Sequence, residues 1–290
     1  MIHQLSQGNC SIQVSSLGAE LRSFFNRETG IEYIWQRDPA FWSKSSPILF
    51  PIVGGLKNGQ YRYNGQVYHL PRHGFARERS FLLTGQSANS LCFSLVSDEE
   101  TLAHYPFAFQ LTIRYTLQHN QLQVGYTVSN TGTATQYFSI GAHPAFRVPM
   151  KSTDLFEDYF LAWDQPETIG RWPLSADGLI ESKPLPLLNH EKTLPLTKQL
   201  FHQDALVFKN MASRKIAIRS IKHNYGVEMH FEGFPYYGIW SARDADFVCL
   251  EPWCGIADSV DTDGELTHKE GIHHLDPDAQ FTVSWQVRVF

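Results

Sequence analysis

The stretch QLTIRYTLQHNQLQVGYTV, residues 110–128, decides the fold class of this chain. Apolar and polar side chains alternate on both sides of residues 118–121, so every second side chain faces the same way. This pattern is typical of antiparallel strands with one buried and one wet face, and the polar residues between them predict the turn of a β-hairpin. The positions expected to be buried are Leu111, Ile113, Tyr115, Leu117, Leu122, Val124, Tyr126 and Val128.

The same alternation returns elsewhere along the chain. It is clear in FTVSWQVRVF at residues 281–290 and weaker at residues 91–97, 215–221 and 227–231. Helical periodicity is scarce: residues 98–105 predict one short helix, with Asp98 as its N-cap and Pro106 as its stop. Many short strands separated by Gly, Asn and Asp predict an all-β fold, a large antiparallel β-sandwich or barrel with few short helices.

The proline-rich region 164–197 decides between one domain and two. Its weak periodicity is compatible with a linker between domains. However, it also carries many apolar residues, which favours loops or short hairpins packed on the same body. We therefore expect a single domain that spans residues 1–290.

Composition excludes several classes of protein. With 42% hydrophobic and 18% charged residues, the chain can form a sizeable core and is not expected to be disordered. The formal net charge of −5 argues against nucleic acid as a partner. The first residues have no basic region before an apolar run, and no stretch approaches the roughly 20 apolar residues of a membrane span.

The four cysteines predict neither a disulfide framework nor a zinc site, because they are scattered and lack paired ligand spacing. They are Cys10, Cys92, Cys249 and Cys254. Reduced, buried thiols in a cytoplasmic protein are the interpretation that fits this spacing.

Two strings place a histidine beside glycine, proline and aromatic residues. In RHGFAR, residues 72–77, the guanidinium groups could hold hydroxyls or a phosphate, although a surface turn with solvated arginines is the alternative. In GAHPAF, residues 141–146, Pro144 restricts His143 to an extended backbone and so fixes where the imidazole points. An imidazole suits a general acid, but a histidine bonded to a backbone carbonyl is the simpler alternative.

A third string, EPWCGIAD at residues 251–258, follows the apolar run FVCL. Burial there would raise the pKa of Glu251 and make it a better base. The alternative is a buried glutamate that pairs with an arginine for structural reasons. Trp253 could pack on the apolar face of a sugar. Asp204, before the strand-like ALVF, is a further candidate, whereas Asp258 is expected in a solvated acidic turn.

Metal chemistry is not expected from this pattern. His73, His143 and Glu251 have the residue types of a two-histidine, one-carboxylate site, but the clustered spacing of such ligands is absent. His273 and His274 are expected in an exposed loop and receive no role.

Taken in order, these strings resemble the aldose 1-epimerase (mutarotase) family and, within it, the LacX-like branch. The resemblance covers nearly the whole chain, from LGAEL at residues 17–21 to HKEGIHHLDPDAQF at residues 268–281. Between them it runs through residues 46–81, YPFAFQL, GAHPAFRVP, DALVF and EPWCGIAD. No single string is decisive, but their order and spacing together are specific.

The resemblance implies a large galactose mutarotase-like β-sandwich in one domain. It also implies interconversion of the α and β anomers of a hexose, with no metal and no organic cofactor. By the same resemblance Glu251 is the general base, His143 the general acid, His73 a hydrogen-bond partner of the substrate and Asp204 a ligand of its hydroxyls. The expected partner is a small sugar, and the chain is expected to be a monomer or homodimer.

One departure from the family pattern leaves the substrate open. Many relatives carry an arginine where this chain has Gly55, and Arg77 or Arg72 is expected to replace it. Together with Arg79 and Lys57, these cations make a hexose 6-phosphate an alternative substrate. A sugar-binding protein without activity is a second alternative, and a glycoside hydrolase that pairs Glu251 with Asp204 is a weaker third.

Overall fold

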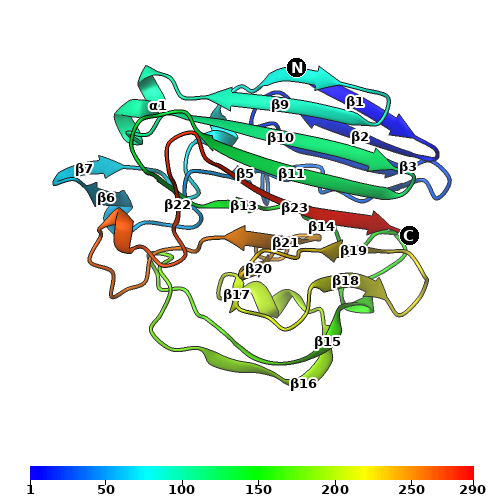
Figure 1. Ribbon diagram of the computed structural model, residues 1–290. Helices are drawn as coiled ribbons and strands as arrows, with labels where there is room; N and C mark the ends of the chain where they lie inside the picture. The colour runs from blue at the N-terminus through cyan, green and yellow to red at the C-terminus, as the bar shows by residue number, and fades with distance from the viewer.

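The computed structural model describes all 290 residues and confirms an all-β fold of antiparallel strands with few short helices. The largest sheet has nine strands and arches across the molecule, from β16 at the bottom of Figure 1 to β9 at the top. In spatial order its strands are β16 (Leu185–Pro195), β15 (Tyr159–Arg171), β18 (Lys215–Ser220), β19 (Gly226–His230), β23 (Gln280–Val289), β11 (Gln121–Asn130), β10 (Phe109–Gln118), β9 (Ser90–Val96) and β8 (Leu82–Gln86).

The hairpin predicted from residues 110–128 is the pair β10 and β11. All eight positions expected to face inward are buried. The strands pair from Phe109–Asn130 to Gln118–Gln121, so the turn is shorter than expected. It consists of His119 and Asn120, and His119 adopts a φ of 53°. The alternation therefore predicted the register correctly. Gln118 and Gln121, which were expected in the turn, pair with each other and extend the two strands by one residue each.

A six-stranded sheet lies inside the arch of the larger one (Figure 1). Every residue of its strand β21 is buried, which explains why the sequence there reads as an apolar run without alternation. Its strands are β17 (Leu206–Lys209), β20 (Tyr236–Trp240), β21 (Phe247–Cys254), β13 (Ile140–Ala142) and β5 (Ile48–Leu49), and β14 (Ala145–Arg147) also pairs with β21.

Smaller sheets and helices complete the architecture. The small sheets comprise β1 (Ile2–Gln7), β2 (Cys10–Ser15), β3 (Leu21–Asn26) and β4 (Ile31–Glu32); β6 (Gln60–Tyr63) and β7 (Gln66–His69); and β12 (Gln136–Phe138) and β22 (His273–Leu275). The predicted helix is α1 (Glu99–His104), capped by Asp98, whose carboxylate accepts the backbone N–H of Thr101 at 2.8 Å. Short 3₁₀ turns occupy Lys57–Gly59, Ala76–Glu78, Phe156–Asp158, Lys198–Phe201 and Leu266–His268. No helix is long and apolar enough to cross a membrane.

The proline-rich region differs in part from its prediction. Residues 159–195 form the long strands β15 and β16 rather than loops, with bulges that break the alternation and so hide the strands in the sequence. The connection between them, residues 172–184, folds back on the six-stranded sheet. There Trp172 donates its backbone N–H to the carbonyl of Val207, and Ile180 donates to that of Asp258.

Two further expectations from the sequence were wrong. Asp258 is not solvated: it is buried and forms an ion pair with buried Lys269 at 2.7 Å. His273 and His274 lie not in an exposed loop but in β22, which pairs with β12. A lysine from a distant segment covers Asp258, and His273 is half-buried in its strand, whereas His274 stays exposed.

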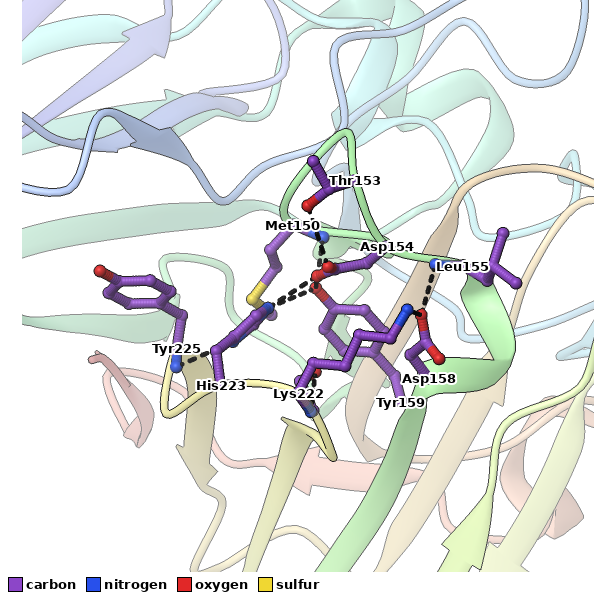
Figure 2. Close-up of polar contacts among 10 residues, drawn as sticks. Met150, Thr153, Asp154, Leu155, Asp158, Tyr159, Lys222, His223 and Tyr225 are labelled. Carbon is purple, nitrogen blue, oxygen red and sulfur yellow. Dashed lines mark hydrogen bonds and ion pairs between the residues drawn. The ribbon is translucent and has the colours of Figure 1, made fainter.

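A polar cluster ties the β14–β15 connection to the β18–β19 turn (Figure 2). His223 and Tyr159 each lie within 2.7 Å of Oδ2 of buried Asp154. Met150 donates its backbone N–H to the Tyr159 hydroxyl at 2.9 Å. The cluster thus fixes two connections of the nine-stranded sheet.

Candidate active site

A cavity of about 430 Å³ opens beside the six-stranded sheet. Its volume lies in the usual range of small-molecule sites. All seven residues singled out in the sequence line it, although they span positions 72 to 253. They are Arg72, His73, Arg77, His143, Asp204, Glu251 and Trp253.

Glu251 lies in the middle of β21, opposite Gly238 of β20, and is 1% exposed. Trp253, on the same face of the strand, is wedged between two glycines. A Cβ on Gly238 would come within 2.4 Å of the Trp253 ring, and one on Gly141 within 2.7 Å. Because burial penalises the carboxylate, the pKa of Glu251 is raised well above its ordinary value.

His143 lies between β13 and β14, and the ring reaches the same point as Glu251. Its Nε2 is 3.3 Å from Oε2 of Glu251. The ring is enclosed by aromatic side chains, stacked on Trp42 at 4.9 Å and edge-on to Trp240 at 5.5 Å between centroids. Burial lowers the pKa of His143 to about 3.

The two groups are left open to a ligand. Neither Oε2 of Glu251 nor Nδ1 of His143 has a hydrogen-bond partner in the protein, although both atoms are buried. Because burial favours the uncharged form of each group, the favoured state of the pair has one proton, held on the carboxyl group. A pair that carries one proton beside a cavity can accept a proton at one point and donate one at another.

His73 has its tautomer fixed by the backbone. Gly54 donates its N–H to Nδ1 of His73 at 3.0 Å, so Nε2 carries the hydrogen and is the donor available to a ligand. Burial lowers the pKa of His73 well below its ordinary value, which keeps the ring neutral. Its φ of 66° is rare for a residue with a side chain, and such conformations concentrate at binding sites.

Asp204 shows the same backbone feature, with a φ of 75° at the entrance to β17. Its Oδ1 accepts the N–H of Ala205 at 2.8 Å, which orients the carboxylate at the cavity. An oriented carboxylate is suited to accept hydrogen bonds from hydroxyl groups.

Both arginines line the cavity and contact each other. Arg72 crosses between Gly55 and Gly178: its Nη2 lies 3.4 Å from the carbonyl oxygen of Gly178, and a Cβ on Gly55 would lie 3.9 Å from its Nε. Arg77 donates from Nη2 to the carbonyl of Arg72 at 2.9 Å, which supports the turn. Arg72 is therefore the guanidinium next to Gly55.

Several residues that line the cavity were not predicted from the sequence. Trp42 comes from an irregular segment without periodicity, and Trp240 ends β20, so no local pattern marks either one. Leu174, Gly178 and Ile180 come from the proline-rich connection. For these three residues, the only feature of the sequence that indicated burial was the number of apolar residues between the prolines.

Comparison with known proteins agrees with this geometry. The family model described as aldose 1-epimerase matches residues 1–270. The chain belongs to the aldose 1-epimerase family. The plasmid-encoded protein LacX of Lactococcus lactis subsp. lactis is 33% identical over 287 residues, which covers 96% of this chain and 95% of that protein.

The LacX relative and the solved structures together place this aldose 1-epimerase family member in the LacX-like, galactose mutarotase-like group. A galactose mutarotase related enzyme from Lactobacillus acidophilus superposes with a TM-score of 0.95 at 34% identity, covering 100% of this chain and 97% of that one. A galactose mutarotase-like protein from Lactobacillus casei superposes with a TM-score of 0.93 at 28% identity, with both chains fully covered. Membership supports an isomerase of the sugar epimerase or mutarotase type.

Proposed function

We propose that this protein interconverts the α and β anomers of a hexose by acid–base opening and closure of the ring. The observation that carries the proposal is the contact between His143 and Glu251, two buried groups with unpaired atoms on one cavity. Anomer exchange needs two proton transfers and no redox step, which is what such a pair can supply.

In the proposed mechanism the pair reacts in its minor form, with the single proton on His143. Glu251, as the carboxylate, removes the proton of the C1 hydroxyl while His143 protonates the ring oxygen. The C1–O5 bond breaks, and a C1 carbonyl forms. Rotation about C1–C2 presents the other face of the carbonyl. Ring closure reverses both transfers, so the pair returns to its starting single proton. Each positioned acid or base contributes about 10²- to 10⁴-fold.

The other lining residues would hold the sugar. His73 donates from Nε2, Asp204 accepts from hydroxyl groups, and the indoles of Trp42 and Trp253 contact C–H faces. Arg72 supplies the cation that Gly55 cannot, because its side chain lies beside that glycine. These roles are part of the proposal.

A polarimetric or NMR assay of freshly dissolved α-glucose and α-galactose tests the activity. We expect exchange much faster than in buffer alone. A sugar that binds without faster exchange would instead favour a non-catalytic sugar-binding protein, and cleavage of a glycoside would favour a hydrolase.

A hexose 6-phosphate remains the second candidate substrate, because Arg72 and Arg77 both line the cavity. Two of the cations that motivated it are engaged elsewhere. Lys57 donates from Nζ to the carbonyl of Val260 at 2.8 Å, and Arg79 pairs with Asp98 and Glu100. Equal or faster exchange of glucose than of glucose 6-phosphate would exclude the phosphorylated substrate.

We also propose the one-domain organisation over residues 1–290. One core cluster draws on strands from both ends of the chain, from Leu5 to Val289. A cytoplasmic location fits the four cysteines, all of which are free thiols. Size-exclusion chromatography would distinguish monomer from homodimer.

A further inference from the structure

Cys249 lies next to the acid–base pair but has no part in the proposed reaction. Side chains alternate along β21, so Cys249 faces the same side as Glu251, two residues further on. It is fully buried and lies opposite Ala145 of β14 and Trp240 of β20. The fold therefore places a thiol on the site's own face of the strand.

The ligand atoms of three side chains converge at this point. One ligand atom each from His143, Cys249 and Glu251 lies within 4.8 Å of the other two. Around tetrahedral zinc, with bonds of about 2.0–2.3 Å, ligand atoms lie about 3.3–3.6 Å apart. Nε2 of His143 and Oε2 of Glu251 are already 3.3 Å apart, which is the spacing of two ligands on one zinc ion.

The cluster has a polar atom without a hydrogen-bond partner, and it borders the cavity. Oε2 of Glu251 is buried and has no hydrogen-bond partner in the protein. His143 and Glu251 are 7% and 1% exposed, yet both line the cavity. Three protein ligands with a fourth position facing a cavity is the arrangement of an open zinc site.

We propose that His143, Cys249 and Glu251 bind a soft divalent cation of the Zn²⁺ class, and that this cation inhibits the enzyme. Thiolate and imidazole ligands select such ions over Mg²⁺ and Ca²⁺. On binding, the thiol proton and the proton shared by the pair leave to solvent, so the cation occupies the positions that the reaction needs. Binding stands on the geometry alone, whereas inhibition rests on the proposed function.

Titration with Co²⁺ tests the binding. We expect a thiolate-to-metal charge-transfer band for the wild-type protein and its loss in Cys249→Ala, with Cys249→Ser as a second variant of similar volume. The matched control is Cys254→Ala, because Cys254 is another buried thiol of β21 whose Sγ lies 3.5 Å from the Gly233 carbonyl instead. A missing band in the wild type, or a band that persists in Cys249→Ala, overturns the inference.

Anomer exchange with added Zn²⁺ tests the inhibition. We expect Zn²⁺ to inhibit the wild type, a chelator to restore it, and Cys249→Ala to weaken inhibition by more than about tenfold while keeping activity without metal. Residues that only orient metal ligands already change affinity by about 10- to 100-fold, so loss of a ligand should do at least this. If the cobalt band forms but Zn²⁺ leaves exchange unchanged, the proposed role of the pair fails and the metal site stands.

Discussion

The protein contains two contacts between a histidine and a buried carboxylate, and their surroundings differ. In one, Nε2 of His223 lies 2.7 Å from Oδ2 of Asp154 (Figure 2). In the other, Nε2 of His143 lies 3.3 Å from Oε2 of Glu251. Both use the same chemical groups, but only the second lines the cavity.

The difference lies in the remaining hydrogen-bonding atoms. Tyr159 donates its hydroxyl to Asp154, and Tyr225 donates its N–H to Nδ1 of His223 at 3.1 Å. Burial alone would raise the pKa of Asp154, but the hydrogen bonds from Tyr159 and His223 lower it below its ordinary value. In the other pair, Oε2 of Glu251 and Nδ1 of His143 have no such partners. A satisfied pair holds connections together, and an unsatisfied one is available to a ligand.

The largest expected effect follows from removing the charge at the open pair. Glu251→Gln keeps the shape of the side chain but cannot accept the C1 proton, so we expect anomer exchange to fall by about 10²- to 10⁴-fold. Progress curves of fresh α-glucose measure this directly. The fold should persist, because a neutral side chain suits this buried position.

A matched control for that change is Glu167→Gln. Glu167 is also buried, but it accepts the backbone N–H of Ser213 at 2.6 Å and lies outside the cavity. Its replacement should leave exchange unchanged. Full activity in Glu251→Gln would contradict the catalytic role proposed for the His143–Glu251 pair, and this pair would then not differ in function from the His223–Asp154 pair.

At the His223–Asp154 pair, whose polar atoms are hydrogen-bonded, we expect an effect on stability. Asp154→Ala leaves the Tyr159 hydroxyl and Nε2–H of His223 without their acceptor, which should lower the free energy of unfolding by about 1–3 kcal/mol. Urea unfolding measures the change, and exchange activity should not follow it. Asp246→Ala, at an exposed ion pair, should cost less than about 1 kcal/mol.

A smaller effect is expected from Trp42→Leu. Loss of the stacked indole loosens and hydrates His143, and aromatic contacts of this kind are worth about 0.5–1.5 kcal/mol, or about two- to tenfold in kcat/KM. Hydration should also raise the pKa of His143. An unchanged rate would indicate that the aromatic enclosure does not position the ring.

The subtlest expectation concerns the acid limb of the pH profile. A glutamate with its usual pKa would gain a proton near pH 4.3. It could then no longer act as a base, and activity would fall below that pH. Here the pair gains its second proton only near the lowered pKa of His143, about 3, so kcat/KM should stay level down to about pH 4. Trp42→Leu should shift the limb upward. Circular dichroism at each pH checks folding, since Asp154 contributes stability above pH 3.8 and loses it as pH falls through its lower folded pKa.

Much of the fold could be predicted because period-two alternation reports burial residue by residue. It failed where burial is uniform or interrupted, as in β21 and the bulged strands β15 and β16. The seven predicted site residues came from short strings, and the structure places them on one cavity. Trp42 and the burial of Asp258 could not be predicted, because each depends on a contact with a distant segment, His143 in one case and Lys269 in the other.

The connection between β15 and β16 has a consequence for how sugar preference can change. It forms one wall of the cavity through Leu174, Gly178 and Ile180, and none of these carries a titratable group. Backbone hydrogen bonds at Trp172 and Ile180 attach it to the rest of the site. This wall thus comes from a different stretch of the chain than Glu251 and His143. We therefore expect that grafting residues 172–184 from a relative would reshape this wall of the cavity while leaving Glu251 and His143 untouched.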